Sequence, residues 1–157
     1  LVGAVFTQRP ELFNAVVCQV PLLDMRRYHT LLAGASWMAE FGNPDVPEDW
    51  AHIARYSPYQ NVAADKAYPE VLFTTSTRDD RVHPAHARKA AARLKEYGYD
   101  YLYYENVDGG CSSEKCVSAV TALGNPLIWW IGGRRADARC SMHTGRRKPL
   151  FSRPLPG

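Results

Sequence analysis

The stretch TTSTRDDRVHP, residues 74–84, decides how the rest of the chain is interpreted. It follows the mostly apolar run YPEVLF, residues 68–73, which predicts a buried parallel strand. It precedes residues 85–97, whose composition predicts a helix. Open α/β folds keep their chemistry in the loops that leave the C-terminal ends of parallel strands. The carboxylates of this loop are therefore candidate functional groups.

The rest of the chain repeats the alternation of strand and helix. Residues 15–20 are β-branched and almost wholly apolar, which predicts a strand covered on both faces. Residues 101–105 predict a third strand rich in aromatic side chains. Residues 1–6 read as the body of a helix, and residues 24–32 as a short helix with Asp24 as its N-cap. This order predicts the α/β class, with a parallel sheet flanked by helices.

Composition sets the broad class of protein. The 157 residues are 46% hydrophobic and 22% charged with a net charge of +3, which is typical of a soluble globular domain. A charge this small gives no support to nucleic-acid binding. There is no apolar run long enough to cross a membrane and no signal-peptide pattern at the start, so we expect a cytoplasmic protein.

The character of the chain changes after Gly110. Residues 111–116 are polar without a clear period, and the apolar residues 117–131 are interrupted by Gly-Asn-Pro. Residues 132–157 are rich in Arg and end in Pro-containing sequence with no apolar period, which predicts a disordered tail.

Several short motifs occur in an order and spacing that resembles the prolyl oligopeptidase family of serine peptidases. The resemblance covers residues 1–110, and its motifs are, in chain order, QRPELF (8–13), Asp24-Met25, Tyr28-His29, Trp37, YSP (56–58), Asn61-Val62, Tyr68-Pro69 and DDRV (79–82). The agreement of many separate motifs makes the resemblance specific. It implies an incomplete α/β-hydrolase fold without its N-terminal strands. Residues 1–131 would then be the C-terminal portion of a peptidase catalytic domain.

The resemblance also implies roles for individual residues. Asp79 corresponds to the acid of a Ser-Asp-His triad, which orients the imidazole and stabilises its charged form. Arg81 corresponds to a residue that holds a carbonyl of the bound peptide. Trp37 corresponds to the aromatic that stacks on the substrate proline, in a pocket also walled by Phe41, Leu22 and Val82. The implied substrates are short peptides cleaved after proline, and no cofactor or metal is implied.

Each of these residues also has a plainer interpretation. Asp79 could cap the following helix or pair with Arg78, Arg81 could form a surface ion pair, and Trp37 could belong to the core. Phe41 stands where the family commonly has Tyr, so a hydroxyl contact there is lost.

The triad is incomplete in this sequence. No serine has glycine at both positions of a G-x-S-x-G elbow, and in the family that elbow lies just before the segment matching residues 1–4. The family's histidine follows Gly-Gly, but after Gly109-Gly110 this chain has Cys111. Because a thiol cannot replace imidazole as a proton shuttle near neutral pH, we expect the chain to be inactive alone.

Other interpretations remain open at this point. The chain could be a non-catalytic fragment or pseudo-enzyme, and the loss of pattern after Gly110 suggests a reading-frame shift. Such a fragment could need the missing N-terminal part to fold. A metal site built from Cys111, Cys116, Cys140 and His143 has loose spacing. Nucleic-acid binding by the basic tail lacks interleaved aromatics.

Overall fold

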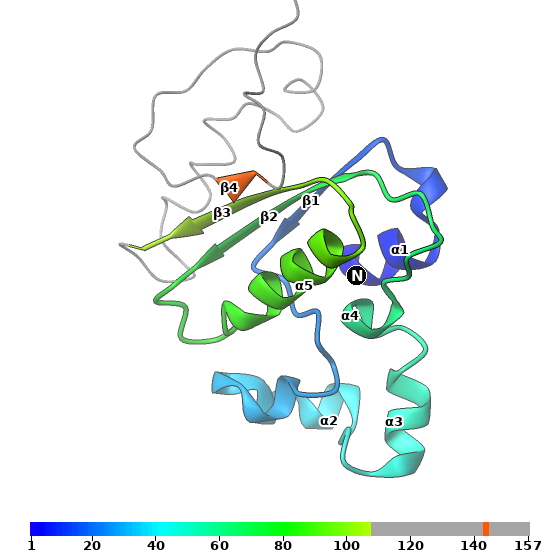
Figure 1. The fold of residues 1–157 in the computed structure, drawn as a ribbon. Coiled ribbons are helices and arrows are strands. Elements are labelled where there is room, and N and C mark those ends of the chain that lie inside the picture. The colour runs from blue at the N-terminus through cyan, green and yellow to red at the C-terminus, as the bar shows by residue number, and fades with distance from the viewer. Residues whose placement is uncertain (108–142, 145–157) are drawn as a thin grey trace, which may run out of the picture.

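A small parallel sheet organises the protein. The computed structural model describes residues 1–107 and 143–144. Strands β1 (Ala15–Gln19), β2 (Glu70–Ser76) and β3 (Tyr101–Asn106) run parallel in that order, with β2 in the middle (Figure 1). The two-residue strand β4 (His143–Thr144) pairs antiparallel with β3. The predicted α/β class is confirmed.

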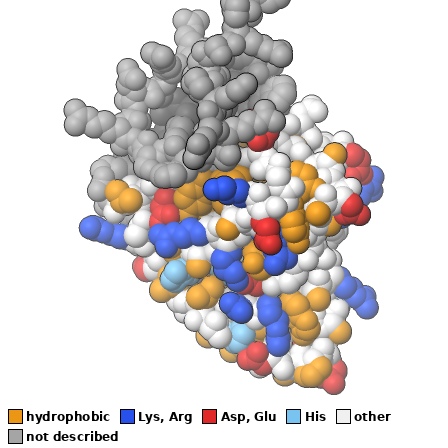
Figure 2. Space-filling model, viewed as in Figure 1, with side chains coloured by type: hydrophobic (Ala, Val, Ile, Leu, Met, Phe, Trp, Pro, Cys, Tyr) orange, Lys and Arg blue, Asp and Glu red, His pale blue; other side chains and the backbone are white. Residues whose placement is uncertain are grey.

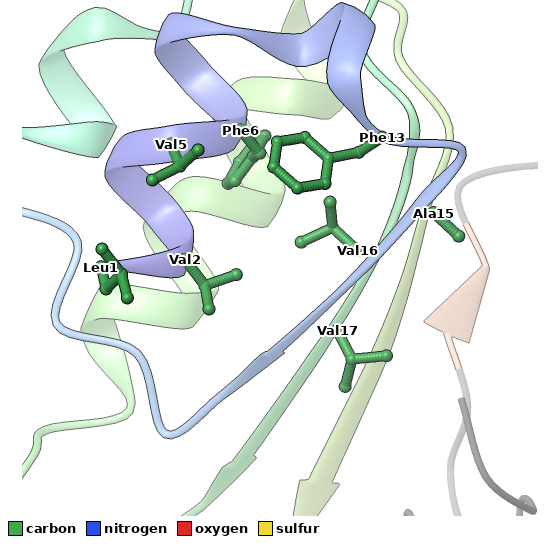
Figure 3. Close-up of a pocket in the computed structure, with 8 residues that line it drawn as sticks. All are labelled: Leu1, Val2, Val5, Phe6, Phe13, Ala15, Val16 and Val17. Atoms are coloured by element: carbon green, nitrogen blue, oxygen red, sulfur yellow. The ribbon is translucent and has the colours of Figure 1, made fainter. Parts of the chain in front are cut away.

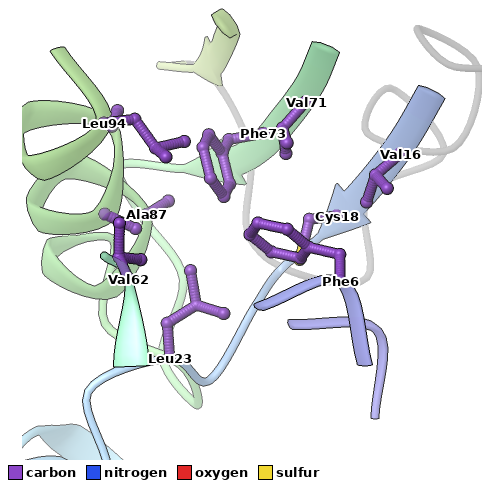
Figure 4. Close-up of a cluster of buried hydrophobic side chains, with 11 residues drawn as sticks. Phe6, Val16, Cys18, Leu23, Val62, Val71, Phe73, Ala87 and Leu94 are labelled. Carbon is purple, nitrogen blue, oxygen red and sulfur yellow. The ribbon is translucent and has the colours of Figure 1, made fainter. Parts of the chain in front are cut away.

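The main core lies on one face of this sheet. Helices α1 (Val2–Gln8) and α5 (Ala85–Glu96) both pack there, where Phe6 and Leu94 meet Val16, Val71 and Phe73 of the strands (Figure 4). The apolar sequence of β1 had predicted a strand covered on both faces. The described elements cover it on one face only, so this prediction is wrong for the described part of the chain. The burial of β1 alternates, because α1 and α5 share one face of the sheet.

The long connection from β1 to β2 forms a second, smaller layer. It contains the 3₁₀ helices η2 (Tyr28–Thr30) and η3 (Leu32–Trp37) and the short helices α2 (Met38–Phe41), α3 (Pro47–Ile53) and α4 (Pro58–Asn61). Helices α2 and α3 lie apart from the sheet, below it in the view of Figure 1. A further 3₁₀ turn, η1 (Pro10–Leu12), joins α1 to β1.

One glycine sets the close packing of this layer. A Cβ at Gly34 in η3 would run into the backbone carbonyl of Tyr28 in η2. Because a backbone carbonyl cannot move aside as a flexible side chain can, the two turns approach this closely only with glycine at this position.

Asp24 does not cap a helix, which corrects the sequence-based prediction for residues 24–32. It is buried, with only 1% of its surface exposed, and its carboxylate pairs with Lys89 of α5. The partner is 65 residues away along the chain, so local sequence could not indicate it.

The face of the molecule seen in Figure 2 is of mixed character. Figure 2 shows Lys and Arg side chains interspersed with acidic and hydrophobic ones on the side from which α5 is viewed. None of the helices in the described ranges has the length and apolar character of a membrane span. Apart from β4, the segment predicted to be a disordered tail lies outside the described residues.

Candidate active site

Asp79 lies in the turn that follows β2, at the C-terminal edge of the sheet. The strand is central, since it pairs with a neighbour on each side, and the residues between its first and last are all apolar or β-branched. The N–H of Thr77 donates to the carbonyl of Asn106 at 2.9 Å, which holds the chain leaving β2 against the end of β3. The sheet therefore holds the turn that contains Asp79 in a fixed position.

The two oxygens of the Asp79 carboxylate have different surroundings. Oδ1 accepts the backbone N–H groups of Arg81 at 2.9 Å and Val82 at 2.8 Å. Oδ2 is buried and has no hydrogen-bond partner among the described residues. The side chain is only 4% exposed. Because burying a carboxylate oxygen without a donor is unfavourable, this geometry favours an additional donor at Oδ2.

The plainer interpretations of Asp79 do not fit this geometry. The helix that follows, α5, begins at Ala85 with no side-chain cap, so Asp79 does not cap it. The described ion pairs do not join Asp79 to Arg78. The carboxylate closes the turn at residues 79–82 and leaves one oxygen available.

Arg81 and Val82 lie in the same turn as Asp79. Arg81 is exposed, and its guanidinium forms no ion pair among the described residues. Val82 is half-buried, and Asp80 is exposed. The turn therefore presents a cationic side chain next to a buried carboxylate.

Three other predicted site residues belong to the second layer. Leu22, Trp37 and Phe41 are all partly buried and pack against the same buried cluster of Met25, Tyr28 and Ile53. The ring of Phe41 meets the ring of Tyr28 edge-on, with centroids 5.9 Å apart. We call Leu22, Trp37 and Phe41 the aromatic wall. Val82 and Arg81 are not part of this cluster.

A charged clamp near Asp79 was not indicated by the sequence. Glu105 of β3 accepts hydrogen bonds from Arg88 of α5, from Thr77 at 2.6 Å and from Tyr103 at 2.7 Å. Burial alone would raise the pKa of Glu105, but these donors outweigh it and lower the pKa to about 2. The clamp ties the ends of β2 and β3 to the helix that follows Asp79. Its partners are up to 28 residues apart in sequence, and no local signal marks them.

This clamp predicts an acid-sensitive contribution to stability. Because the folded pKa lies below the ordinary value of 4.5, the contribution is present above pH 4.5 and is lost as the pH falls toward 2. We would measure the free energy of unfolding with a chemical denaturant at a series of pH values. Between pH 4.5 and 2 this free energy should fall more steeply in the wild type than in Glu105→Gln. Replacing the exposed Glu96 with Gln is the control and should leave the slope unchanged. Equal slopes for wild type and Glu105→Gln would contradict this role.

The two histidines near Asp79 have local partners. Nδ1 of His83 accepts the N–H of Ala85 at 3.0 Å. His86 is buried, with 1% of its surface exposed, and its Nδ1 accepts the N–H of Asp24 at 3.1 Å. The described hydrogen bonds of the Asp79 carboxylate involve neither histidine.

The metal interpretation receives no support from the described part of the chain. Within residues 1–107, no group of three His, Cys, Asp or Glu side chains comes together as a metal site requires. Cys111, Cys116 and Cys140 lie outside the described residues. The thiol of Cys18 is in the core, and burial raises its pKa to about 12, so it does not react as a thiolate at neutral pH.

The sequence of this chain is similar to known peptidases over most of its length. The model of the prolyl oligopeptidase family matches residues 1–120. An uncharacterised peptidase of Sinorhizobium fredii is 56% identical over 110 residues, covering 70% of this chain and 15% of that protein. A prolyl endopeptidase of Dictyostelium discoideum is 41% identical over 96 residues, covering 60% of this chain and 13% of that protein.

Solved structures agree with this result. The structure of a post-proline cleaving enzyme from Rickettsia typhi superposes with a TM-score of 0.69 at 44% identity, covering 71% of this chain and 16% of that one. The chain thus spans about 15% of the length of the first curated relative. The fold is that of the α/β-hydrolase domain of these enzymes, and the chain belongs to the prolyl oligopeptidase family.

Proposed function

We propose that this chain contributes the C-terminal portion of the catalytic domain of a serine peptidase that cleaves short peptides after proline. Asp79 would act as the triad acid. The observation that carries this proposal is the asymmetric Asp79 carboxylate, with Oδ1 held by two backbone N–H groups and Oδ2 buried without a partner among the described residues. A histidine N–H donated to Oδ2 would be fixed in one tautomer, with its other nitrogen directed at a nucleophile.

The aromatic wall would receive the substrate proline. An indole face suits a pyrrolidine ring, and Trp37 is only partly buried, so part of its surface is available to a ligand. Arg81, which has no ionic partner among the described residues, would donate to a carbonyl of the peptide and fix its register. Leu22, Phe41 and Val82 would line the remainder of the pocket.

The 157 residues are not expected to hydrolyse peptides by themselves. They contain no G-x-S-x-G elbow, and Cys111 stands where the family places its histidine. Catalysis needs a nucleophile and a base in addition to an orienting acid. A non-catalytic fragment or pseudo-enzyme is therefore the alternative for this chain taken alone.

An apolar groove supports the proposal that this chain packs against a further part of the hydrolase domain. The groove has a volume of about 330 Å³ and lies between α1 and β1 (Figure 3). It is lined by apolar residues only, namely Leu1, Val2, Val5, Phe6, Phe13, Ala15, Val16 and Val17. Strand β1 also pairs on one side only within the described sheet. Exposed apolar surface beside an open strand edge favours association.

A graft tests the proposed function. Residues 1–107 of this chain would replace the matching segment of the Rickettsia typhi enzyme, which would then supply serine and histidine. We expect the graft to cleave a fluorogenic peptide after proline and to spare the matching alanine peptide. A folded graft with no proline-specific cleavage would contradict the proposal.

A further inference from the structure

The loop between β1 and η2, which carries Leu22 of the aromatic wall, follows a strained path. Val20 has a φ of 41°, in the left-handed region that β-branched residues avoid. Its N–H donates to the carbonyl of Thr74 at 2.8 Å, which keeps the start of the loop beside β2. A backbone held in such a region persists only where the surroundings enforce it.

The side chain of Asp24, in the same loop, contacts helices α4 and α5. Its Oδ2 pairs with Nζ of Lys89, and its Oδ1 accepts the Nε2–H of Gln60 at 2.6 Å. Burial alone would raise the pKa of Asp24, but the bonds from Lys89 and Gln60 outweigh it and lower the pKa, so the carboxylate is charged at neutral pH.

The backbone of the same loop is held as well. The N–H of Met25 donates to Oγ of Ser57 at 3.2 Å, and the carbonyl of Leu23 accepts the N–H of Tyr59 at 3.0 Å. The N–H of Asp24 donates to His86. Burial lowers the pKa of His86 to about 4, so its ring is neutral at pH 7 and can accept this bond.

The carboxylate of Asp24 is buried, whereas the side chain of Lys89 is 29% exposed. We expect this ion pair to restrict the position of the loop more than it stabilises the fold. Two apolar side chains of similar volume would often stabilise a core equally well. A carboxylate whose two oxygens each bind a separate donor holds the loop in one position. The helix that provides Lys89 and His86 is the one that directly follows the Asp79 turn. Helix α5 is thus connected to the turn that contains Asp79 and also holds the loop of residues 20–25.

We propose that Asp24 is a positioning residue for the proline pocket: its braced carboxylate holds residues 20–25 in the strained path that places Leu22 in the aromatic wall. Its consequence for substrate rests on the proposed function above. The position of the loop does not, and it can be measured in the chain as it exists.

Amide hydrogen exchange on the full chain tests this proposal. In Asp24→Asn, the amides of Val20, Asp24 and Met25 should exchange about tenfold faster relative to the amides of β2, because the loop opens locally. The control is Val71→Ala in the core of β2, which should destabilise the whole fold. It should therefore speed exchange of the loop amides and the β2 amides by the same factor. Lys89→Met removes the partner of the Asp24 carboxylate and should give the same local pattern of faster exchange. It serves as the second variant in case Asp24→Asn does not fold.

The outcomes separate this proposal from the proposed function. Uniform acceleration in both Asp24→Asn and Lys89→Met, or no acceleration, would overturn the positioning role. In the graft, Asp24→Asn should raise KM for the proline peptide about tenfold, with a smaller change in kcat. Local acceleration in the chain together with a graft that does not cleave would reject the proposed function and leave the positioning role in place.

Discussion

Replacing Asp79 with Asn in the graft should lower kcat about 10⁴-fold, the loss seen when a triad acid is replaced by its amide. The amide has nearly the same shape, and its oxygen can still accept the N–H groups of Arg81 and Val82. At the other position, however, it presents an NH₂ donor where a histidine N–H needs an acceptor. The imidazole would then be held in the wrong tautomer and could not take the proton of the nucleophile. Steady-state kinetics with a proline-specific fluorogenic peptide would measure this loss.

Asp80→Asn is the matched control for this experiment. Asp80 is the neighbouring residue, carries the same charge and is exposed. It should leave kcat unchanged, because its carboxylate does not take part in closing the turn. Equal losses for the two variants would mean that charge in this loop matters and that Asp79 has no special role.

Replacing Phe73 with Ala should destabilise the chain by about 3–5 kcal/mol. Phe73 is 0% exposed on the central strand and belongs to the cluster that joins the sheet to α1 and α5. Removing the ring leaves a cavity between the sheet and the helices α1 and α5, and these elements cannot move far enough to fill it. Since small domains are stable by only about 5–15 kcal/mol, this loss would remove a large part of the total. Urea unfolding followed by circular dichroism would measure it.

Leu72→Ala provides the comparison on the same strand. Leu72 is half-buried and points away from the α1–α5 core, because alternate residues of a strand face opposite sides. Its loss should be clearly smaller than that of Phe73. A larger effect at Leu72 would indicate that the opposite face of the sheet is the more tightly packed one.

Local patterns in the sequence predicted the elements that carry the site. The helix expected after Asp79 formed as α5, because helix periodicity depends on near neighbours. The strand expected at residues 68–73 formed as β2, but it begins at Glu70 and extends to Ser76, into the stretch that was predicted to be a loop. The position of Asp79 at the C-terminal end of a parallel strand followed directly from that pattern. The family resemblance is confirmed by the match over residues 1–120.

Contacts between distant residues could not be predicted in the same way. Asp24 resembled an N-cap because an aspartate before a short mixed segment is a local capping signal, yet a lysine 65 residues away binds it. The clamp at Glu105 depends in the same way on Arg88 from a different element. Burial of β1 on one face only depends on where α1 and α5 pack. A single sequence contains no local record of these pairings.

We propose that this chain supplies a triad acid and a proline pocket to a peptidase domain but cannot catalyse alone. The most direct test of this proposal compares the purified chain with the graft on one proline-specific fluorogenic peptide. We expect background hydrolysis for the chain and turnover for the graft that is lost in Asp79→Asn. Turnover by the purified chain that rises with its concentration and disappears in Asp79→Asn would contradict the proposal.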